Sequence, residues 1–234
     1  MRVRTYGQSG PLAIALHGGP GAPGVMAPVA RALADRFRVL EPFQRSSGPE
    51  PLTVARHVAD LRELVESLGE DARPALVGSS WGAMLALAFA AAHPDLAGPL
   101  ALIGCGTFDP AARARFNETL EARMDAGLRQ RLAALGEDEL AERGRLILPL
   151  YCCDAVTEDL ELEECDARGH REPAIMLHGA EDPHPGRMIL ASLRSHMPQL
   201  EYREWARCGH YPWIERAARD DFFACLRSWL TAAA

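Results

Sequence analysis

Two serines lie between glycines in the stretch "LVGSSWGAML" at residues 76–85, and a hydroxyl in such a turn can act as a nucleophile. Gly78, Ser80 and Gly82 fit the pattern G-x-S-x-G, in which the central serine occupies a sharp turn between a strand and a helix. Glycines suit the flanking positions because neighbouring Cβ atoms would obstruct the strained turn. Ser80 is therefore the predicted nucleophile, and a glycine-rich turn without chemistry is the alternative.

A serine hydroxyl needs a base to accept its proton, and the base needs a carboxylate to hold its tautomer. His210, in "RCGHYPWIE", and Asp182, in "LHGAEDPHP", each follow an apolar run that is typical of a strand. The chain order Ser80, Asp182, His210 is the order in which G-x-S-x-G enzymes carry their nucleophile, acid and base. Glu181 is the nearest competitor of Asp182 for the role of the acid.

The stretch "LHGGPGAPG" at residues 16–24 predicts a turn that could stabilise an oxyanion. A tetrahedral intermediate needs two backbone N–H donors aimed at one oxygen, and glycines allow a close approach of the backbone. The predicted donors are the N–H groups of Gly19 and Trp81. A phosphate-binding loop is disfavoured because no G-K-[ST] follows and the spacing is not G-x-G-x-x-G. The substrate pocket is expected to include Gly18, Tyr151 and Tyr211.

Five other histidines and the cysteines are not expected to take part in catalysis. His57, His93 and His196 are expected to be solvated or to cap helices. His170 and His184 could line a pocket. No H-x3-H, HExxH or Cys/His cluster is present, so no metal is expected. All six cysteines are expected to be thiols because no CxxC pair occurs, and a bridge between Cys152 and Cys165 is the alternative.

These residues must be positioned by a sheet, because short apolar runs alternate with longer helical patterns. The expected strands cover residues 12–18, 37–43, 74–79, 99–104, 173–179 and 200–206. Helical spacing is clear at 53–69, where Thr53 is a plausible N-cap, and residues 82–94 are apolar nearly all round, as in a buried helix. Such alternation predicts an α/β fold with a mostly parallel central sheet flanked by helices.

The alternation is interrupted once, from residue 107 to about residue 170. No strand pattern occurs there, and the stretch is rich in Arg, Glu, Ala and Leu. We expect residues 1–106 and 171–234 to form the core and residues 107–170 to form a small helical cap, which acts as a lid over Ser80. The most apolar part of this insertion, "LPLYCCDAV" at 148–156, is expected either to face the site or to pack the cap onto the core.

Composition excludes several classes of function. The formal net charge is −7 at pH 7, whereas nucleic-acid-binding proteins concentrate Lys and Arg on one face. The N-terminus lacks a signal-peptide pattern, and no run of 18 apolar residues occurs, so a cytoplasmic location without membrane association is expected. The length suits one domain with an insertion.

Five motifs together resemble the α/β-hydrolase superfamily, and within it the proline iminopeptidase-like serine hydrolases. They are "HGGPG" at 17–21, "FQRSSG" at 43–48, "GSSWG" at 78–82, "HGAEDP" at 178–183 and "GHYPWIE" at 209–215. The resemblance implies Ser80 as nucleophile, Asp182 as acid and His210 as base, with Gly19 and Trp81 as oxyanion donors. It covers roughly residues 10–106 and 173–230, and it does not extend to the insertion.

The expected function is that of a cofactor-free serine hydrolase, which cleaves a small carboxylic ester or amide through an acyl-enzyme. An aminopeptidase of the proline iminopeptidase type is the named alternative, although Phe43 and Ser46 depart from the D-Q-R-G-S stretch that such enzymes usually carry. Hydrolysis of a carbon–carbon bond in a diketone, acyl transfer, and ligand binding without turnover are further alternatives. The expected partner is a small-molecule ester, an amide or a short peptide, and neither nucleic acid nor a membrane.

Overall fold

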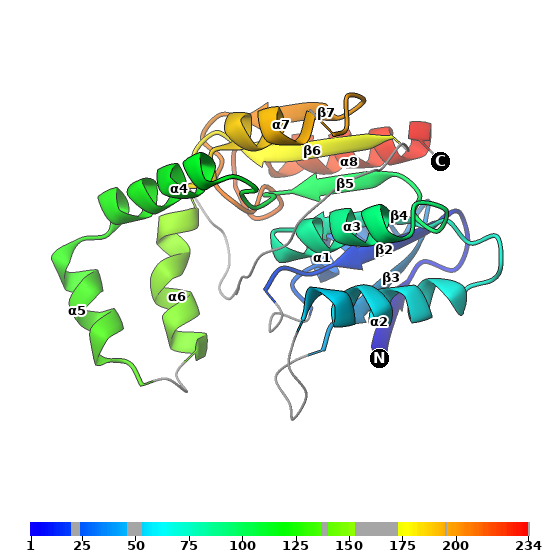
Figure 1. The fold of residues 1–234 in the computed structure, drawn as a ribbon, viewed down its shortest axis with the longest axis horizontal. Helices are drawn as coiled ribbons and strands as arrows, with labels where there is room; N and C mark the ends of the chain where they lie inside the picture. Colours follow the sequence, from blue (N-terminus) through cyan, green and yellow to red (C-terminus); the bar gives the residue numbers. More distant parts are fainter. Residues whose placement is uncertain (20–23, 46–52, 137–139, 153–172, 195, 234) are drawn as a thin grey trace.

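A twisted seven-stranded sheet forms the centre of the molecule (Figure 1). The computed structural model describes residues 1–19, 24–45, 53–136, 140–152, 173–194 and 196–233. The strands are β1 (Arg2–Tyr6), β2 (Leu12–Leu16), β3 (Arg38–Phe43), β4 (Ala75–Ser79), β5 (Leu100–Ile103), β6 (Ala174–Gly179) and β7 (Glu201–Trp205), in the spatial order β1-β3-β2-β4-β5-β6-β7. All neighbouring pairs are parallel except β1 with β3. The predicted mostly parallel sheet is thus confirmed.

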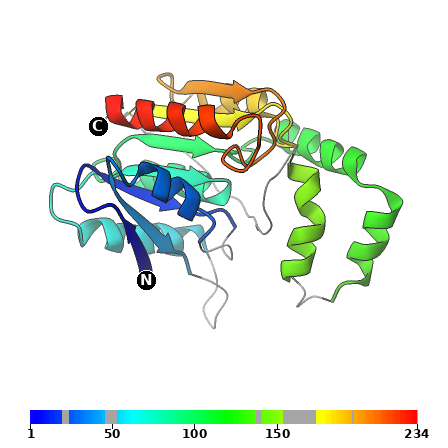
Figure 2. The same cartoon turned by 180° about the vertical axis from the view of Figure 1, so that it is seen from behind.

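Helices cover both faces of the sheet. Three of them, α2 (Val54–Glu66), α3 (Trp81–Ala92) and α7 (Gly186–Arg194), stand in front of the sheet in Figure 1, while α1 (Ala27–Leu33) and α8 (Arg219–Ala233) stand in front of it in Figure 2. Successive residues of β4 point to opposite faces of the sheet. Val77 belongs to the buried apolar cluster that includes α1 and α8, and Leu76 belongs to the one that includes α2 and α3. Burial on both sides explains why the central strands are continuous apolar runs.

The first strand, β1, was not predicted. It lies at the edge of the sheet, where its residues are exposed or only half-buried, and its sequence "RVRTY" lacks an apolar run. The partner strand β3 holds it in antiparallel register, with Arg2 opposite Phe43. The guanidinium groups of Arg2 and Arg4 lie over the Phe43 ring at 4.5 and 4.6 Å from its centre. A strand stabilised in this way is set by its neighbour rather than by its own hydrophobic pattern.

Three helices lie between β5 and β6, within the stretch predicted to be a helical cap. They are α4 (Pro110–Arg123), α5 (Ala126–Ala134) and α6 (Leu140–Tyr151). Asp109 and Asp125 cap α4 and α5, because each side chain accepts a hydrogen bond from a backbone N–H in the first turn. These helices extend away from the sheet beyond the carboxyl ends of β5 and β6 (Figure 1). Residues 153–172 of the predicted cap lie outside the described residues.

No helix in the described part of the chain is long and apolar enough to cross a bilayer. The predicted helices at 53–69 and 82–94 are confirmed as α2 and α3, and the Thr53 side chain caps α2 by accepting a hydrogen bond from the Arg56 N–H.

Helix α3 packs so closely on β2 that only glycine fits at residue 82. A Cβ atom there would lie 2.1 Å from the carbonyl oxygen of Leu16, and a Cβ atom on Gly78 would lie 2.2 Å from the carbonyl oxygen of Gly82. Both obstacles are backbone atoms inside the sheet and its covering helix, so neither can yield without moving an element. The two glycines of G-x-S-x-G therefore set the distance between α3 and the sheet.

A Gly82→Ala variant is expected to lose more than about 3 kcal/mol of unfolding free energy, since backbone must move to admit the methyl group. Gly127→Ala is the matched control, because Gly127 is also the second residue of a helix and a Cβ there meets only a side-chain oxygen, of Asp125, at 3.3 Å. Because alanine has a higher helix propensity than glycine, Gly127→Ala should leave the unfolding free energy equal to that of wild type or raise it by less than about 1 kcal/mol. Urea unfolding measures both variants, and equal stabilities of Gly82→Ala and Gly127→Ala would contradict the steric role of Gly82.

Candidate active site

Ser80 follows β4 directly and adopts a backbone conformation that few residues tolerate. Its φ is 52° and its ψ is −116°, and such strain is of the order of 1–3 kcal/mol. The neighbouring strand holds the turn, because the Ser80 N–H donates to the carbonyl of Ile103 at 2.8 Å. The Ser80 carbonyl in turn accepts the first hydrogen bonds of α3, from Ala83 and Met84. Ser80 thus occupies the predicted turn between a strand and a helix, whereas Ser79 belongs to the strand.

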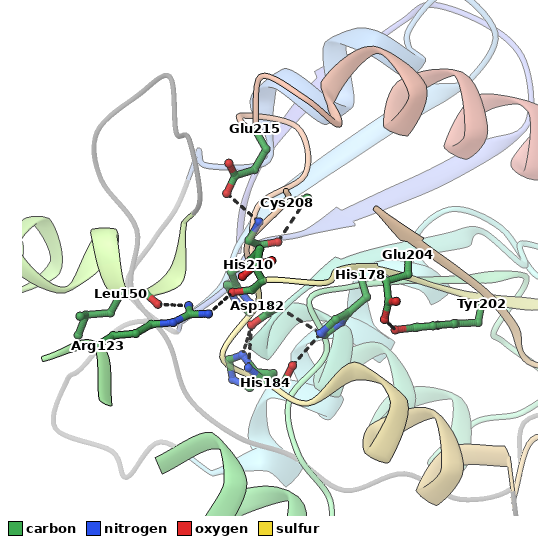
Figure 3. Close-up of polar contacts among 12 residues, drawn as sticks. Arg123, Leu150, His178, Asp182, His184, Tyr202, Glu204, Cys208, His210 and Glu215 are labelled. Atoms are coloured by element: carbon green, nitrogen blue, oxygen red, sulfur yellow. Dashed lines mark hydrogen bonds and ion pairs between the residues drawn. The ribbon is translucent and has the colours of Figure 1, made fainter. Parts of the chain in front are cut away.

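The predicted acid and base lie together at the ends of β6 and β7 (Figure 3). The Nδ1 atom of His210 lies 2.7 Å from the Oδ2 atom of Asp182, and both side chains are fully buried. Burial alone would raise the pKa of the Asp182 carboxyl, but the imidazoles of His210, His184 and His178 hold it well below its ordinary value. The competitor Glu181 is exposed; its backbone carbonyl accepts a hydrogen bond from Arg123, and its backbone N–H donates to the Cys208 carbonyl.

The two ring nitrogens of His210 are in different states, because Nδ1 binds Asp182 and Nε2 does not. An ionised Asp182 accepts a hydrogen bond, so Nδ1 of His210 must carry a proton, and in the neutral ring Nε2 then carries the lone pair. This Nε2 atom is buried, and within the described ranges it has no hydrogen-bond partner. The ring lies against Gly104, where a Cβ atom would be 2.8 Å from it, and Gly104 follows Ile103, whose carbonyl holds Ser80.

The predicted oxyanion donors lie at the ends of adjacent strands. The register pairs Leu16 of β2 with Gly78 of β4, which brings the turn at Gly18 and Gly19 beside the Ser80 turn. Gly19 has a φ of 38°, a left-handed value that suits glycine. Trp81 is the first residue of α3, where backbone N–H groups have no intrahelical acceptor and the helix dipole favours negative charge. Residues 20–23 of the turn lie outside the described part of the chain.

Gln44 joins these two donors, a role that the sequence analysis did not find. Its backbone N–H donates to Nε2 of His17 at 3.1 Å, and its side-chain amide donates to the His17 carbonyl at 2.8 Å. The side-chain oxygen of Gln44 accepts a hydrogen bond from the Trp81 indole at 2.6 Å. Nδ1 of His17 then donates to the carbonyl of Gly18 at 2.9 Å. One buried amide therefore connects the oxyanion turn to the helix that begins at Trp81.

Helices α4 and α6 contact His210 and the loop that carries Asp182. Arg123 of α4 donates to the carbonyls of Leu150 and Glu181 at 2.6 and 2.7 Å, and so ties both α4 and α6 to that loop (Figure 3). The carbonyl of Tyr151 accepts a hydrogen bond from the His210 N–H at 2.7 Å, and the two rings meet edge to face with centroids 5.5 Å apart. Leu150 and Tyr151 also belong to the buried apolar cluster of the core, so the described part of 148–156 fits both expectations for this segment.

The other two predicted pocket residues lie in the layer that supports the site. The Tyr211 ring is fully buried between His210 and Trp213, with centroids 4.5 and 5.4 Å away, and Gly18 is buried with its carbonyl bound to His17. Burial raises the pKa of Tyr151 to about 12 and raises that of Tyr211 well above its ordinary value. Both phenols therefore remain neutral at physiological pH.

One histidine differs from its predicted role. His57 was expected to be solvated or to cap a helix, but it is 3% exposed and packs edge to face on the Trp81 ring at 5.4 Å. The buried face of α2 includes it because α2 packs on α3, which the sequence periodicity alone did not specify. His184, a candidate pocket residue, binds Asp182 through Nδ1 at 2.8 Å and stacks on His210.

Asp182, His184 and His210 could in principle share a metal ion, since their ligand atoms lie within 4.8 Å of one another. Each imidazole, however, directs a protonated Nδ1 at a carboxylate oxygen, so these atoms already satisfy one another by hydrogen bonds. Cys105, Cys152, Cys208 and Cys225 are thiols. The alternative bridge from Cys152 involves Cys165, which like Cys153 lies outside the described residues.

Comparison with known proteins finds a matching family model and a curated relative. A family model described as the alpha/beta hydrolase family matches residues 13–223. A curated relative, the 2-hydroxy-6-oxononadienedioate/2-hydroxy-6-oxononatrienedioate hydrolase of Paraburkholderia phymatum, is 27% identical over 190 residues, which cover 68% of this chain and 63% of the relative. The match thus spans less than two thirds of that relative's length.

Two solved structures share the fold over nearly the whole chain. A thermophilic esterase from Thermogutta terrifontis superposes with a TM-score of 0.67 at 22% identity, covering 99% of this chain and 93% of that one. The enol-lactonase from Burkholderia xenovorans LB400 superposes with a TM-score of 0.65 at 23% identity, covering 98% and 96%. At these identities the likeness establishes the fold.

The Gln44 network predicts a loss of stability when the amide is removed. Gln44→Met keeps the length of the side chain but leaves the His17 carbonyl and the Trp81 indole without a partner. Each buried group left unpaired should lower the unfolding free energy by about 1–3 kcal/mol. Gln130→Met, at an exposed position of α5, is the control and should stay within about 0.5 kcal/mol of wild type. Equal urea midpoints for the two variants would contradict the role of Gln44.

Stability is expected to fall as the pH is lowered from about 7 to 5. Burial lowers the pKa of His17, of His57 and of His184, the last to about 4, whereas an unfolded histidine takes up its proton near pH 6.5. The unfolded chain then binds more protons, so each such group lowers the unfolding free energy by up to about 1.4 kcal/mol per pH unit. The depressed pKa of Asp182 acts in the same direction at still lower pH.

Urea unfolding at pH 7 and pH 5 measures this dependence. A His57→Gln variant should show a shallower pH dependence than wild type, while His196→Gln, at an exposed position, is the control. A protein that became more stable at pH 5 would not have these histidines buried as neutral groups.

Proposed function

The chain belongs to the alpha/beta hydrolase family, and we propose that it is a serine hydrolase in which Ser80, His210 and Asp182 cleave a small carboxylic ester through an acyl-enzyme. The observation that carries the proposal is the state of His210. The Asp182 carboxylate accepts the Nδ1–H of His210, with 2.7 Å between Nδ1 and Oδ2, so the lone pair of the ring lies on Nε2. Nε2 is buried and has no hydrogen-bond partner among the described residues. The ring lies against Gly104, which follows the residue whose carbonyl binds the Ser80 N–H. A base in this state is ready to accept a proton from a serine or from water.

The proposed reaction begins when Nε2 of His210 accepts the hydroxyl proton of Ser80 as the oxygen attacks the carbonyl carbon. The oxyanion that forms accepts hydrogen bonds from the N–H groups of Gly19 and Trp81, at the positive end of α3. His210 then gives the proton to the leaving alcohol, and the C–O bond breaks to leave the acyl group on Ser80. A water molecule, deprotonated by the same nitrogen, attacks the acyl carbon and releases the carboxylic acid, which restores Ser80.

The surroundings of the base favour an uncharged substrate. The described rings in contact with His210 are those of Tyr151, His184 and Tyr211, and all three are neutral at physiological pH. Uncharged aromatic surroundings of the base suit the acyl or alcohol part of an ester. The free ammonium group of a prolyl peptide would need an acidic partner, and in the described part of the site Asp182 is already engaged by imidazoles. An aminopeptidase of the proline iminopeptidase type therefore remains the alternative.

The curated relative from Paraburkholderia phymatum supports a second candidate, a hydroxy-oxo-dienedioate like that in the relative's name. The same serine, base and oxyanion donors would act on its keto group, so the two candidates share Ser80 and differ only in substrate.

Labelling with a fluorophosphonate tests whether Ser80 is the activated serine. Wild type and Ser79→Ala are expected to label, and Ser80→Ala is expected to lose both the label and at least about a thousandfold of kcat. Ser79 is the matched control because it is the adjacent buried serine of the same motif. A folded wild-type protein that does not label would contradict the proposal and favour a ligand-binding protein without turnover.

A substrate panel separates the candidates. We expect higher kcat/KM on p-nitrophenyl acetate and p-nitrophenyl butyrate than on prolyl-p-nitroanilide or on 2-hydroxy-6-oxononadienedioate. A preference for the prolyl substrate would support the aminopeptidase, and a preference for the dienedioate would support the second candidate.

A further inference from the structure

Asp182 binds more than one histidine in the folded protein. Three imidazole nitrogens lie around its carboxylate: Nδ1 of His210 at 2.7 Å, Nδ1 of His184 at 2.8 Å, and Nε2 of His178 at 3.4 Å (Figure 3). Only the first has a part in the proposed reaction. The side chain of His184 is only 7% exposed and that of Asp182 is fully buried, so water competes little for their hydrogen bond.

The two carboxylate oxygens are divided between the histidines. Oδ1 accepts two hydrogen bonds from His184, one from its backbone N–H at 2.9 Å and one from Nδ1–H at 2.8 Å. Oδ2 accepts the hydrogen bond from Nδ1–H of His210. The carboxylate therefore cannot rotate without breaking both bonds from His184, and this arrangement keeps Oδ2 directed at His210.

The ring of His184 is itself held in place from both sides. It stacks on His210, with centroids 4.7 Å apart and planes 25° apart, and on Phe116 of the cap helix α4, with centroids 4.3 Å apart and planes 28° apart. Nε2 of His178 donates to the His184 carbonyl at 3.0 Å. Tilting of the His184 ring would disrupt both stacking contacts. A 180° flip would keep the ring plane but would lose the hydrogen bond from Nδ1–H to Oδ1.

We propose that His184 is a positioning residue, which fixes the Asp182 carboxylate through Oδ1 so that Oδ2 holds His210 in the tautomer needed for catalysis. Phe116 extends this support into the cap, because it packs on the free face of the His184 ring. This inference rests on the proposed function of His210 as the base. It adds that the orientation of the acid depends on a second histidine and on a residue of the cap.

Two substitutions separate the hydrogen bond from the stacking. His184→Phe keeps a flat ring between Phe116 and His210 but removes the donor, whereas His184→Asn places an amide N–H near the position of Nδ1 and removes the ring. Without the donor, part of the protein holds the carboxylate turned away and His210 in the wrong tautomer. We expect kcat of His184→Phe on p-nitrophenyl butyrate to fall about tenfold with KM within about twofold, since the phenyl ring keeps the shape and packing of the imidazole.

His184→Asn is expected to recover kcat to within about threefold of wild type, because the conservative donor is restored. If His184→Phe does not fold, as judged by urea unfolding, His184→Leu is the second variant without a donor. Equal losses in the Phe and Asn variants would show that ring packing alone matters and would overturn the proposal. So would a His184→Phe variant with wild-type kcat, or an Asn variant that is worse than the Phe variant.

Proton NMR of the resting protein gives a readout that does not depend on turnover. The His210 proton between Nδ1 and Oδ2 should give a far-downfield resonance, assigned by its absence in His210→Gln. We expect it to weaken or broaden in His184→Phe and to persist in His184→Asn; a sharp, unchanged resonance in His184→Phe would overturn the proposal. Full activity in Ser80→Ala would refute the proposed function instead, and the resonance would still decide the role of His184.

Discussion

The hydrogen bond between Asp182 and His210 is the interaction on which the rest of the proposed chemistry depends. At 2.7 Å and out of contact with water, it fixes where the imidazole proton lies and therefore which nitrogen is available as a base. A buried carboxylate without partners would become protonated, and the surrounding imidazoles prevent this by favouring its charged form. The acid thus requires its histidine neighbours as much as His210 requires the acid.

The parallel sheet brings these groups together from distant parts of the sequence. Ser80 follows β4, Asp182 follows β6 and His210 follows β7, and the carboxyl ends of parallel strands meet at one edge of the sheet. The apolar clusters on the two faces keep the strands in register, and the glycine at position 82 lets α3 approach β2 closely enough to place Trp81 beside the oxyanion turn. The helices inserted between β5 and β6 then contact the loop that carries Asp182 through Arg123, and contact His210 through Tyr151.

Much of this could be predicted from the sequence because it depends on local pattern. The glycines around Ser80, the apolar central strands and the position of His210 after a strand are all visible in the residue order, and they placed the fold and the proposed site residues. The edge strand β1 was missed because its stability comes from β3 rather than from an apolar run. The role of Gln44 and the hydrogen bond from His184 to Asp182 were not predicted, because both depend on loop conformation, which spacing does not encode.

The central claim is that the base activates Ser80 to form a covalent acyl-enzyme, and trapping that species tests it most directly. Rapid acid quench during turnover of p-nitrophenyl butyrate, followed by intact-mass and peptide mass spectrometry, would detect a butyryl group on the chain. One butyryl group is expected on the peptide that contains Ser80, formed in the burst phase and absent from Ser80→Ala. A burst of product without a covalent adduct, or an adduct on another residue, would contradict it.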